Sequence, residues 1–143
     1  MNNARVTVPT ARNEPILGYL PGSPEKATLK TQLAAFANES TEIPLIIGGR
    51  DVTTGDLGNC ILPHDHRKQL ATYHRGNADT VNQAIAAADA ARADWSAMPW
   101  ESRVAIFLRA AELLAGRYRP VLNAATMLNQ SKTVFQSEID AAC

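Results

Sequence analysis

The sequence predicts a chain of mixed helices and strands, with an extended arm, a small antiparallel β meander and three to four α-helices in that order. Three observations support this prediction. Residues 1–24 contain four prolines. Residues 43–75 hold short apolar runs separated by glycine-containing turns. From residue 77 onward the apolar residues recur at the spacing of a helix. We therefore divide the chain into residues 1–24, 25–76 and 77–143.

Composition limits the classes of protein to which the chain can belong. Its 143 residues and 15.4 kDa suffice for one ordinary domain. Apolar residues make up 45% and charged residues 20%, which is typical of a globular chain. Fourteen basic and 14 acidic residues balance to zero, so nothing indicates a nucleic-acid partner. Apolar runs are too short to predict a membrane span, and two cysteines give no disulfide framework.

The arm is expected to be extended because proline lacks a backbone donor and restricts φ. Its apolar residues are predicted to dock on another surface, and they are Ile16, Leu17, Tyr19 and Leu20. No apolar signal segment precedes them, which favours a cytoplasmic protein. Ser23 then resembles an N-cap, with Pro24 at the first helical position and a helix continuing to about Asn38.

The segment 43–75 is predicted to form the antiparallel meander. β-branched residues and the hairpin signal Gly48-Gly49 carry this prediction. Residues 55–59 have turn chemistry. The expected strands are 43–47, 50–54, 60–62 and 70–74.

Helices are expected from Asn77, which can act as an N-cap. Pro99 breaks the first helix and starts the second, and Gly116 ends the second. A third helix is expected over residues 117–128, and Ser131 is predicted to cap a fourth. The apolar pattern of that fourth helix is still running at Cys143, with no stop signal, so we expect a truncated sequence.

Several residue types could carry chemistry, and each has a simpler interpretation. His64-Asp65-His66 contains metal-ligand types, but Pro63 favours a turn. Cys60 and Cys143 lack an activating partner nearby in sequence, so we interpret both as packing residues.

The glycines and the aromatic residues are interpreted in the same way. Gly48-Gly49 and Gly55 to Gly58 are expected in hairpin turns, because a phosphate-binding turn leads from a strand into a helix. Trp95 and Trp100 are expected to lock a helix corner rather than bind a ligand. Glu138 and Asp140 are expected on the solvated surface. The residues alone therefore indicate no complete catalytic set.

Longer segments resemble a known family. Residues 86–118, AAADAARADWSAMPWESRVAIFLRAAELLAGRY, resemble the first two helices of the aldehyde dehydrogenase superfamily, and residues 43–76 resemble its opening strands. NEPILGYLPGSPEK, PHDH, LATYH and NAATMLNQSKTVFQSEIDAAC are similar to the 1-pyrroline-5-carboxylate dehydrogenase subfamily. The resemblance implies an α/β fold with a Rossmann-type parent domain, of which this chain is an N-terminal part.

The resemblance also implies an activity. The subfamily uses NAD to oxidise L-glutamate γ-semialdehyde to L-glutamate in proline breakdown, through a cysteine thiolate and a general-base glutamate. Those residues lie downstream in the family, so no catalytic, cofactor-binding or metal-binding residue is assigned here. A homo-oligomeric parent is implied, and a mitochondrial matrix location if the source is eukaryotic.

One candidate site residue follows from the resemblance. The helix that carries Gln136, Ser137 and Glu138 is implied to lie near the mouth of the substrate tunnel, where Glu138 would contact the amino group of the semialdehyde. A plain surface acid is the alternative, and both stay open at this point.

Two other functions also stay open: a stand-alone interaction or oligomerisation module, and a dehydrogenase for another aldehyde. In isolation we expect a chain that lacks turnover and is aggregation-prone or partly molten.

Overall fold

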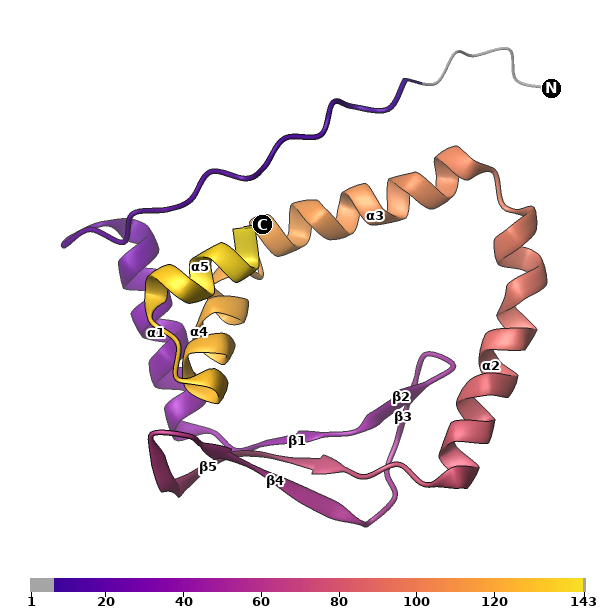
Figure 1. Cartoon of the computed structure of the whole chain (residues 1–143), viewed down its shortest axis with the longest axis horizontal. Coiled ribbons are helices and arrows are strands. Elements are labelled where there is room, and N and C mark those ends of the chain that lie inside the picture. Colours follow the sequence, from indigo (N-terminus) through magenta and orange to yellow (C-terminus); the bar gives the residue numbers. More distant parts are fainter. Residues whose placement is uncertain (1–6, 143) are drawn as a thin grey trace.

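The computed structural model describes residues 7–142. Within that range it contains five helices and five strands. Figure 1 shows α2 leaving the strands and α3 turning back towards a cluster of α1, α4 and α5. The elements are α1 Pro24–Asn38, β1 Thr41–Ile43, β2 Leu45–Ile47, β3 Arg50–Val52, β4 Leu57–Leu62, β5 Asp65–His74, α2 Ala78–Ala97, α3 Trp100–Ala115, α4 Arg119–Gln130 and α5 Val134–Ala142.

The strands form two sheets instead of the single antiparallel meander that was predicted. β5 is the centre of a three-stranded sheet, with β4 antiparallel on one side and β1 parallel on the other. β2 and β3 form a separate antiparallel hairpin around Gly48 and Gly49. Pro44 explains the error, because a residue without an N–H interrupts the predicted strand 43–47 and separates β1 from β2. After this hairpin the chain forms β4, and β5 then pairs with β1 in the parallel direction.

β4 begins earlier than predicted, so part of the expected turn at 55–59 is strand. Gly58 lies opposite Tyr73 in the register of β4 and β5. A Cβ atom at position 58 would collide with the Tyr73 ring, which explains why a residue without a side chain continues the strand there. Pro63 and His64 form the turn between β4 and β5, as the turn interpretation of this segment predicted.

The predicted starts of the first two helices are confirmed. The Ser23 Oγ accepts a hydrogen bond from the backbone N–H of Lys26 at 3.4 Å. Asn77 and Thr80 cap α2 reciprocally, with 3.0 Å between Thr80 N and Asn77 Oδ1. Because each side chain satisfies a backbone N–H that lacks a partner within the helix, both starts were readable from the sequence.

The predicted cap of the last helix is wrong. Ser131 ends α4 in a left-handed conformation with φ of 53°. Thr133 caps α5 instead, because the backbone N–H of Gln136 donates to Thr133 Oγ1 at 3.3 Å. Gln136 Oε1 accepts the Thr133 N–H in return at 2.9 Å.

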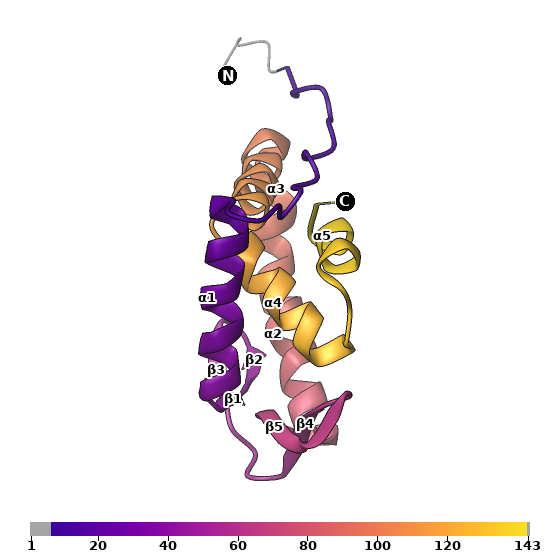
Figure 2. The ribbon, with the colours of Figure 1, turned by 90° about the vertical axis from the view of Figure 1, so that its left-hand side faces the viewer.

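The buried apolar core lies where the arm meets α1 and α4. Tyr19, Leu29 and Ala124 are buried at its centre. Figure 2 shows α1 and α4 side by side. Leu17 and Tyr19 of the predicted apolar group dock there, whereas Ile16 and Leu20 remain exposed.

The apolar stripes of α2 and α3 are largely exposed. Trp95 packs edge-on against Phe107 at 6.4 Å between ring centroids, which joins the two helices as the corner interpretation predicted for Trp95. Trp100 is 47% exposed and takes no part in that aromatic pair. Among the described residues, no helix combines the length and apolar character that crossing a bilayer requires. The large apolar side chains exposed on these helices are Val81, Ile85, Trp95, Trp100, Ile106, Phe107, Leu108 and Leu114.

Candidate functional site

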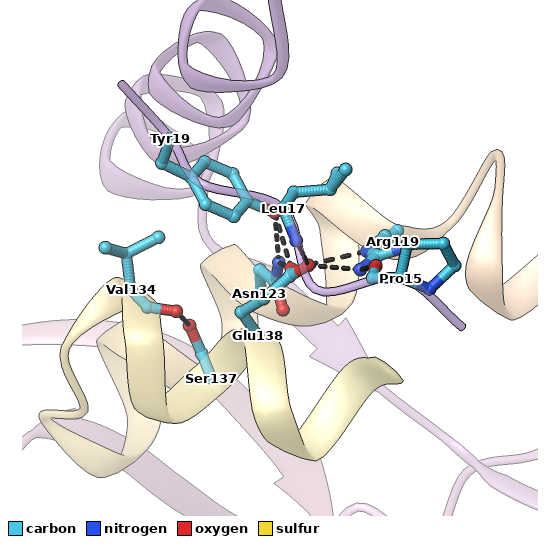
Figure 3. A network of polar contacts seen from close by, with 8 residues as sticks. All are labelled: Pro15, Leu17, Tyr19, Arg119, Asn123, Val134, Ser137 and Glu138. Atoms are coloured by element: carbon cyan, nitrogen blue, oxygen red, sulfur yellow. Dashed lines mark hydrogen bonds and ion pairs between the residues drawn. The ribbon is translucent and has the colours of Figure 1, made fainter. Parts of the chain in front are cut away.

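A buried polar cluster lies where the arm crosses α4 and α5 (Figure 3). We call Tyr19, Arg119, Asn123 and Glu138 the Glu138 cluster. Tyr19 comes from the arm, Arg119 and Asn123 from α4, and Glu138 from α5. All four side chains are buried, and Glu138 and Asn123 are 0% exposed. Four polar side chains buried together require mutual hydrogen bonds, because unpaired polar groups are costly inside a protein.

The Glu138 carboxylate accepts hydrogen bonds from two parts of the chain, the arm and α4. Its Oε1 atom accepts the Leu17 backbone N–H at 2.8 Å and also pairs with Arg119 Nη2. Its Oε2 atom accepts the Tyr19 hydroxyl at 2.6 Å and Asn123 Nδ2 at 2.7 Å, with Arg119 Nε at 3.3 Å. A carboxylate offers about four lone-pair sites, so these donors saturate it.

The arm also provides acceptors for Arg119 and for the Asn123 amide nitrogen, whereas the buried Asn123 Oδ1 atom has no hydrogen-bond partner among the described residues. Arg119 Nη2 donates to the Pro15 carbonyl oxygen at 2.5 Å. Asn123 Nδ2 donates to the Tyr19 hydroxyl oxygen at 2.7 Å. Arg119 and Asn123 are four residues apart and therefore face the same side of α4. A regular helix thus presents both donors to α5 and to the arm.

The electrostatics favour an ionised Glu138. Burial alone would raise the pKa of its carboxyl group, but the hydrogen bonds from Arg119, Tyr19, Leu17 and Asn123 outweigh that effect and lower the pKa to about 2. Burial, reinforced by the neighbouring carboxylate, raises the pKa of Tyr19 to about 12. Hydrogen bonding to Glu138 also raises the pKa of the Arg119 guanidinium. At neutral pH the cluster is a fixed ion pair with a neutral tyrosine, which suits holding segments together better than transferring protons.

The prediction that Glu138 is a solvated surface acid is wrong. The reason is tertiary, because the arm covers α5 and supplies donors from more than a hundred residues away. Asp140, two residues on, is exposed and pairs with Lys132. Ser137 is buried and its Oγ donates to the Val134 carbonyl at 3.0 Å, whereas Gln136 serves the cap of α5. Direct contact between Glu138 and a substrate amino group stays a prediction.

Tyr19, Arg119 and Asn123 do not stand out as site residues in the sequence. The pattern around Tyr19 predicts only apolar docking. The spacing of Arg119 and Asn123 was visible as a polar pair on one helix face, but such pairs usually face solvent. Only the position of the arm distinguishes this pair from a surface pair.

The histidine segment does not assemble into a metal site. His64 Nδ1 lies 2.9 Å from Ser131 Oγ, and His66 is exposed in β5. His74 is buried, and its Nδ1 accepts the N–H of Thr54 at 3.0 Å while Nε2 lies 2.8 Å from Glu42 Oε1. Within residues 7–142 no group of three or more His, Cys, Asp or Glu side chains is placed to hold a metal.

The remaining candidates have structural positions. Cys60 is half-buried and lines a largely apolar cavity of about 310 Å³ between α1, α4 and the three-stranded sheet. Cys143 lies outside the described residues. Gly48 and Gly49 have positive φ in the hairpin of β2 and β3, as predicted, whereas Gly55 has positive φ at a bend between β3 and β4, which belong to different sheets. None of these glycines joins a strand to a helix, so they do not fit the phosphate turn of a dinucleotide site.

Comparison with known proteins agrees with the resemblance drawn from the sequence. The model of the "Aldehyde dehydrogenase family" matches residues 53–142. Delta-1-pyrroline-5-carboxylate dehydrogenase from Agaricus bisporus is 46% identical over 97% of this chain and 26% of its own length. The mitochondrial Delta-1-pyrroline-5-carboxylate dehydrogenase of Dictyostelium discoideum is 43% identical over 97% of this chain and 25% of its own length.

Solved structures agree over the whole chain. The Delta-pyrroline-5-carboxylate dehydrogenase from Mycobacterium tuberculosis, bound with NAD and cobalamin, superposes with a TM-score of 0.96 at 42% identity. That match covers 100% of this chain and 27% of the other. The chain thus spans about a quarter of the length of the relatives it matches. The predicted aldehyde dehydrogenase-like α/β character is confirmed, and the chain belongs to the aldehyde dehydrogenase family.

Proposed function

We propose that this chain is the N-terminal, non-catalytic part of an NAD-dependent dehydrogenase that oxidises L-glutamate γ-semialdehyde to L-glutamate. One observation carries the proposal: relatives named Delta-1-pyrroline-5-carboxylate dehydrogenase match 97% of the chain in sequence, and a solved structure of such a dehydrogenase matches 100% of it. A match confined to one helix pair would support the fold alone, because one fold serves many chemistries. Here the arm, both sheets and all five helices of the described residues are included.

The contribution of this chain is structural. The turn glycines Gly48, Gly49 and Gly55 do not join a strand to a helix, and no step of the reaction is assigned to this chain. In the proposed enzyme NAD would supply the hydride acceptor, and a nucleophilic cysteine and a general-base glutamate would come from polypeptide outside this chain. The chain would supply helices and strands that support that site.

A substrate role for Glu138 remains part of the proposal. The amino group of the semialdehyde is a cation, and a buried carboxylate is a suitable partner for it. However, the five donors around Glu138 already saturate its oxygens. A substrate ammonium would therefore have to displace one of these donors. Two of them, the Leu17 N–H and the Tyr19 hydroxyl, come from the arm, and the others come from α4.

Homo-oligomerisation and a mitochondrial or cytoplasmic location also belong to the proposal. The exposed apolar residues of α2 and α3 support association with further polypeptide. Relatives from Dictyostelium discoideum, Danio rerio and Mus musculus carry the word mitochondrial in their names. A cytoplasmic location remains the prediction from the sequence, and the mitochondrial matrix applies if the source is eukaryotic.

A chimera tests the proposed activity. These 143 residues replace the matching segment of the Mycobacterium tuberculosis enzyme, and NADH formation is followed by absorbance with glutamate γ-semialdehyde as substrate. We expect turnover by the chimera and none by the isolated chain. Turnover by the isolated chain would contradict the proposal, as would a correctly assembled chimera that binds NAD but does not oxidise this aldehyde.

The same chimera tests the substrate role of Glu138. If Glu138 binds the amino group, Glu138→Gln raises KM for glutamate γ-semialdehyde more than KM for pentanal, which lacks an amino group. An equal effect on both aldehydes would assign Glu138 a purely structural role. Asp140→Asn, on the exposed side of the same helix, is the matched control and is expected to change neither constant.

The stand-alone interaction module remains a second candidate because the apolar faces of α2 and α3 are exposed. Sequencing the transcript beyond the codon of Cys143 separates the two candidates. Continuation into a cysteine-containing catalytic segment supports the dehydrogenase, whereas an immediate stop codon supports the module.

A further inference from the structure

The polar half of the Glu138 cluster can form without the arm. Arg119, Asn123 and Glu138 belong to α4 and α5, which are consecutive helices joined by residues 131–133. Glu138 is 19 residues from Arg119 and 15 from Asn123. Contacts over such short separations cost little loop-closure entropy. We call these three side chains the cradle.

The arm reaches the cradle from the far end of the sequence. Three polar points attach it: the Pro15 carbonyl, the Leu17 N–H and the Tyr19 hydroxyl. The sequence separations of these contacts are 104, 121 and 119 residues. Two of the three points end on Glu138, so this one carboxylate holds most of the polar attachment.

Apart from Leu17 and Tyr19, which also pack on the apolar core, the arm makes little contact with the rest of the described chain. Residues 7–14 are exposed and form neither helix nor strand, and Ile16 and Leu20 are 54% and 68% exposed. Tyr19 has φ of 51°, a left-handed conformation that is unfavourable for a residue with a side chain. Burial of Tyr19 and Leu17 against α1 and α4 assists the attachment but does not require the left-handed backbone of Tyr19. The hydrogen bonds of Leu17 and Tyr19 to Glu138 account for this backbone conformation.

We propose that residues 15–19 are a releasable strap, which Glu138 fastens across α4 and α5 and which detaches without unfolding the cradle or the sheet. The two ends of the described chain are thereby coupled through one side chain. When the strap is fastened, it covers α5 and both oxygens of Glu138. When it is released, Glu138 keeps its partners on α4 but loses two of its donors, and a face of α5 opens. The inference concerns the fold and does not depend on the proposed activity.

Hydrogen exchange of individual amides in the full chain, measured by NMR at neutral pH, tests the strap. In the wild-type chain we expect the Leu17 amide to exchange much more slowly than the amides of residues 7–14. The amides shared between β4 and β5 serve as internal reference. In Glu138→Gln the protection of the Leu17 amide is expected to fall by about tenfold to a hundredfold, which is the usual worth of a hydrogen bond to a charged group. The reference amides should remain more protected than the Leu17 amide in both chains.

Two further variants make the result decisive. Tyr19→Phe retains the buried ring and removes one attachment, so the Leu17 amide should lose protection while the amides of α5 keep theirs. Asp140→Asn is the control and should change no rate in the arm. An unprotected Leu17 amide in the wild-type chain would overturn the proposal. So would unchanged protection in Glu138→Gln, or a Leu17 amide as protected as the reference amides in the wild-type chain, because the arm would then open only when the whole chain unfolds.

Discussion

Replacing Glu138 by Gln is expected to remove about 3 kcal/mol from the free energy of unfolding at neutral pH. The side chain keeps its volume, so the change removes charge and introduces an amide donor beside Arg119, without opening a cavity. The magnitude follows from the pKa, which lies at about 2 in the folded chain against an ordinary 4.5, a difference that corresponds to about 3 kcal/mol. Removal of one partner of a buried ion pair costs about 3–5 kcal/mol by a separate route, which agrees.

The measurement is urea denaturation followed by circular dichroism at low protein concentration. Asp140→Asn is the matched control on the same helix, and because its ion pair with Lys132 is exposed we expect a change within about 0.5 kcal/mol. A loss below about 1 kcal/mol in Glu138→Gln would refute this reasoning, because removing the charge of a buried carboxylate that accepts several hydrogen bonds should destabilise the folded chain by more than that.

The pH dependence gives an independent check of the same reasoning. A lowered pKa in the folded state means that the stabilisation is complete above pH 4.5 and is lost as the pH falls from 4.5 towards 2. The difference between the wild-type chain and Glu138→Gln should therefore shrink over this window, although other carboxyl groups titrate in both. A difference that stays constant down to pH 2 would show that the charge of Glu138 is not the source of the stability.

Other predictions address the cluster, the sheet, the last helix and the exposed surface. Tyr19→Phe should lower the free energy of unfolding by about 1.5–3 kcal/mol at pH 7 in urea denaturation, because a hydrogen bond to a charged group is lost. Because the pKa of Tyr19 is raised to about 12, the stabilisation by its neutral hydroxyl should be lost as the pH rises from 10 to about 12, and only in the wild-type chain. Gly58→Ala should cost about 1–3 kcal/mol in the same assay through its clash with Tyr73, and an unchanged midpoint would contradict the packing of β4 on β5. Thr133→Ala should cost about 1 kcal/mol, with Ser131→Ala as the smaller control, because only Thr133 caps α5. The exposed apolar faces of α2 and α3 should bind the dye ANS and cause concentration-dependent association in light scattering, and a chain that stays monomeric without dye binding would contradict that expectation.

Local signals were sufficient for much of the fold. Ser23, Asn77 and Gly116 mark helix ends because each acts on backbone groups within one helical turn. Gly48-Gly49 predicts its hairpin for the same reason, since positive φ is a property of the turn itself. Pro44 is a strand breaker that is visible in the sequence, and it is the local signal that separates β1 from β2.

The sheet and the Glu138 cluster required more than local signals. The parallel pairing of β1 with β5 joins residues about thirty positions apart, and nothing within either strand selects that partner over the neighbouring hairpin. Glu138 has the local pattern of a surface acid beside Asp140, and only the strap makes it a buried one. The pairing of Arg119 with Glu138 is nearer in sequence, but its burial still depends on residues 15–19.

Most helix ends, the hairpin and the family follow from the sequence alone, because caps, turns and motif residues act over a few positions. The tertiary structure decided which polar residues are buried, since burial depends on segments more than a hundred residues apart meeting in space. The burial of Glu138 and its two donors from the arm exist only after that meeting, so neither the desolvation of the ion pair nor the full lowering of the Glu138 pKa is a property of the local sequence.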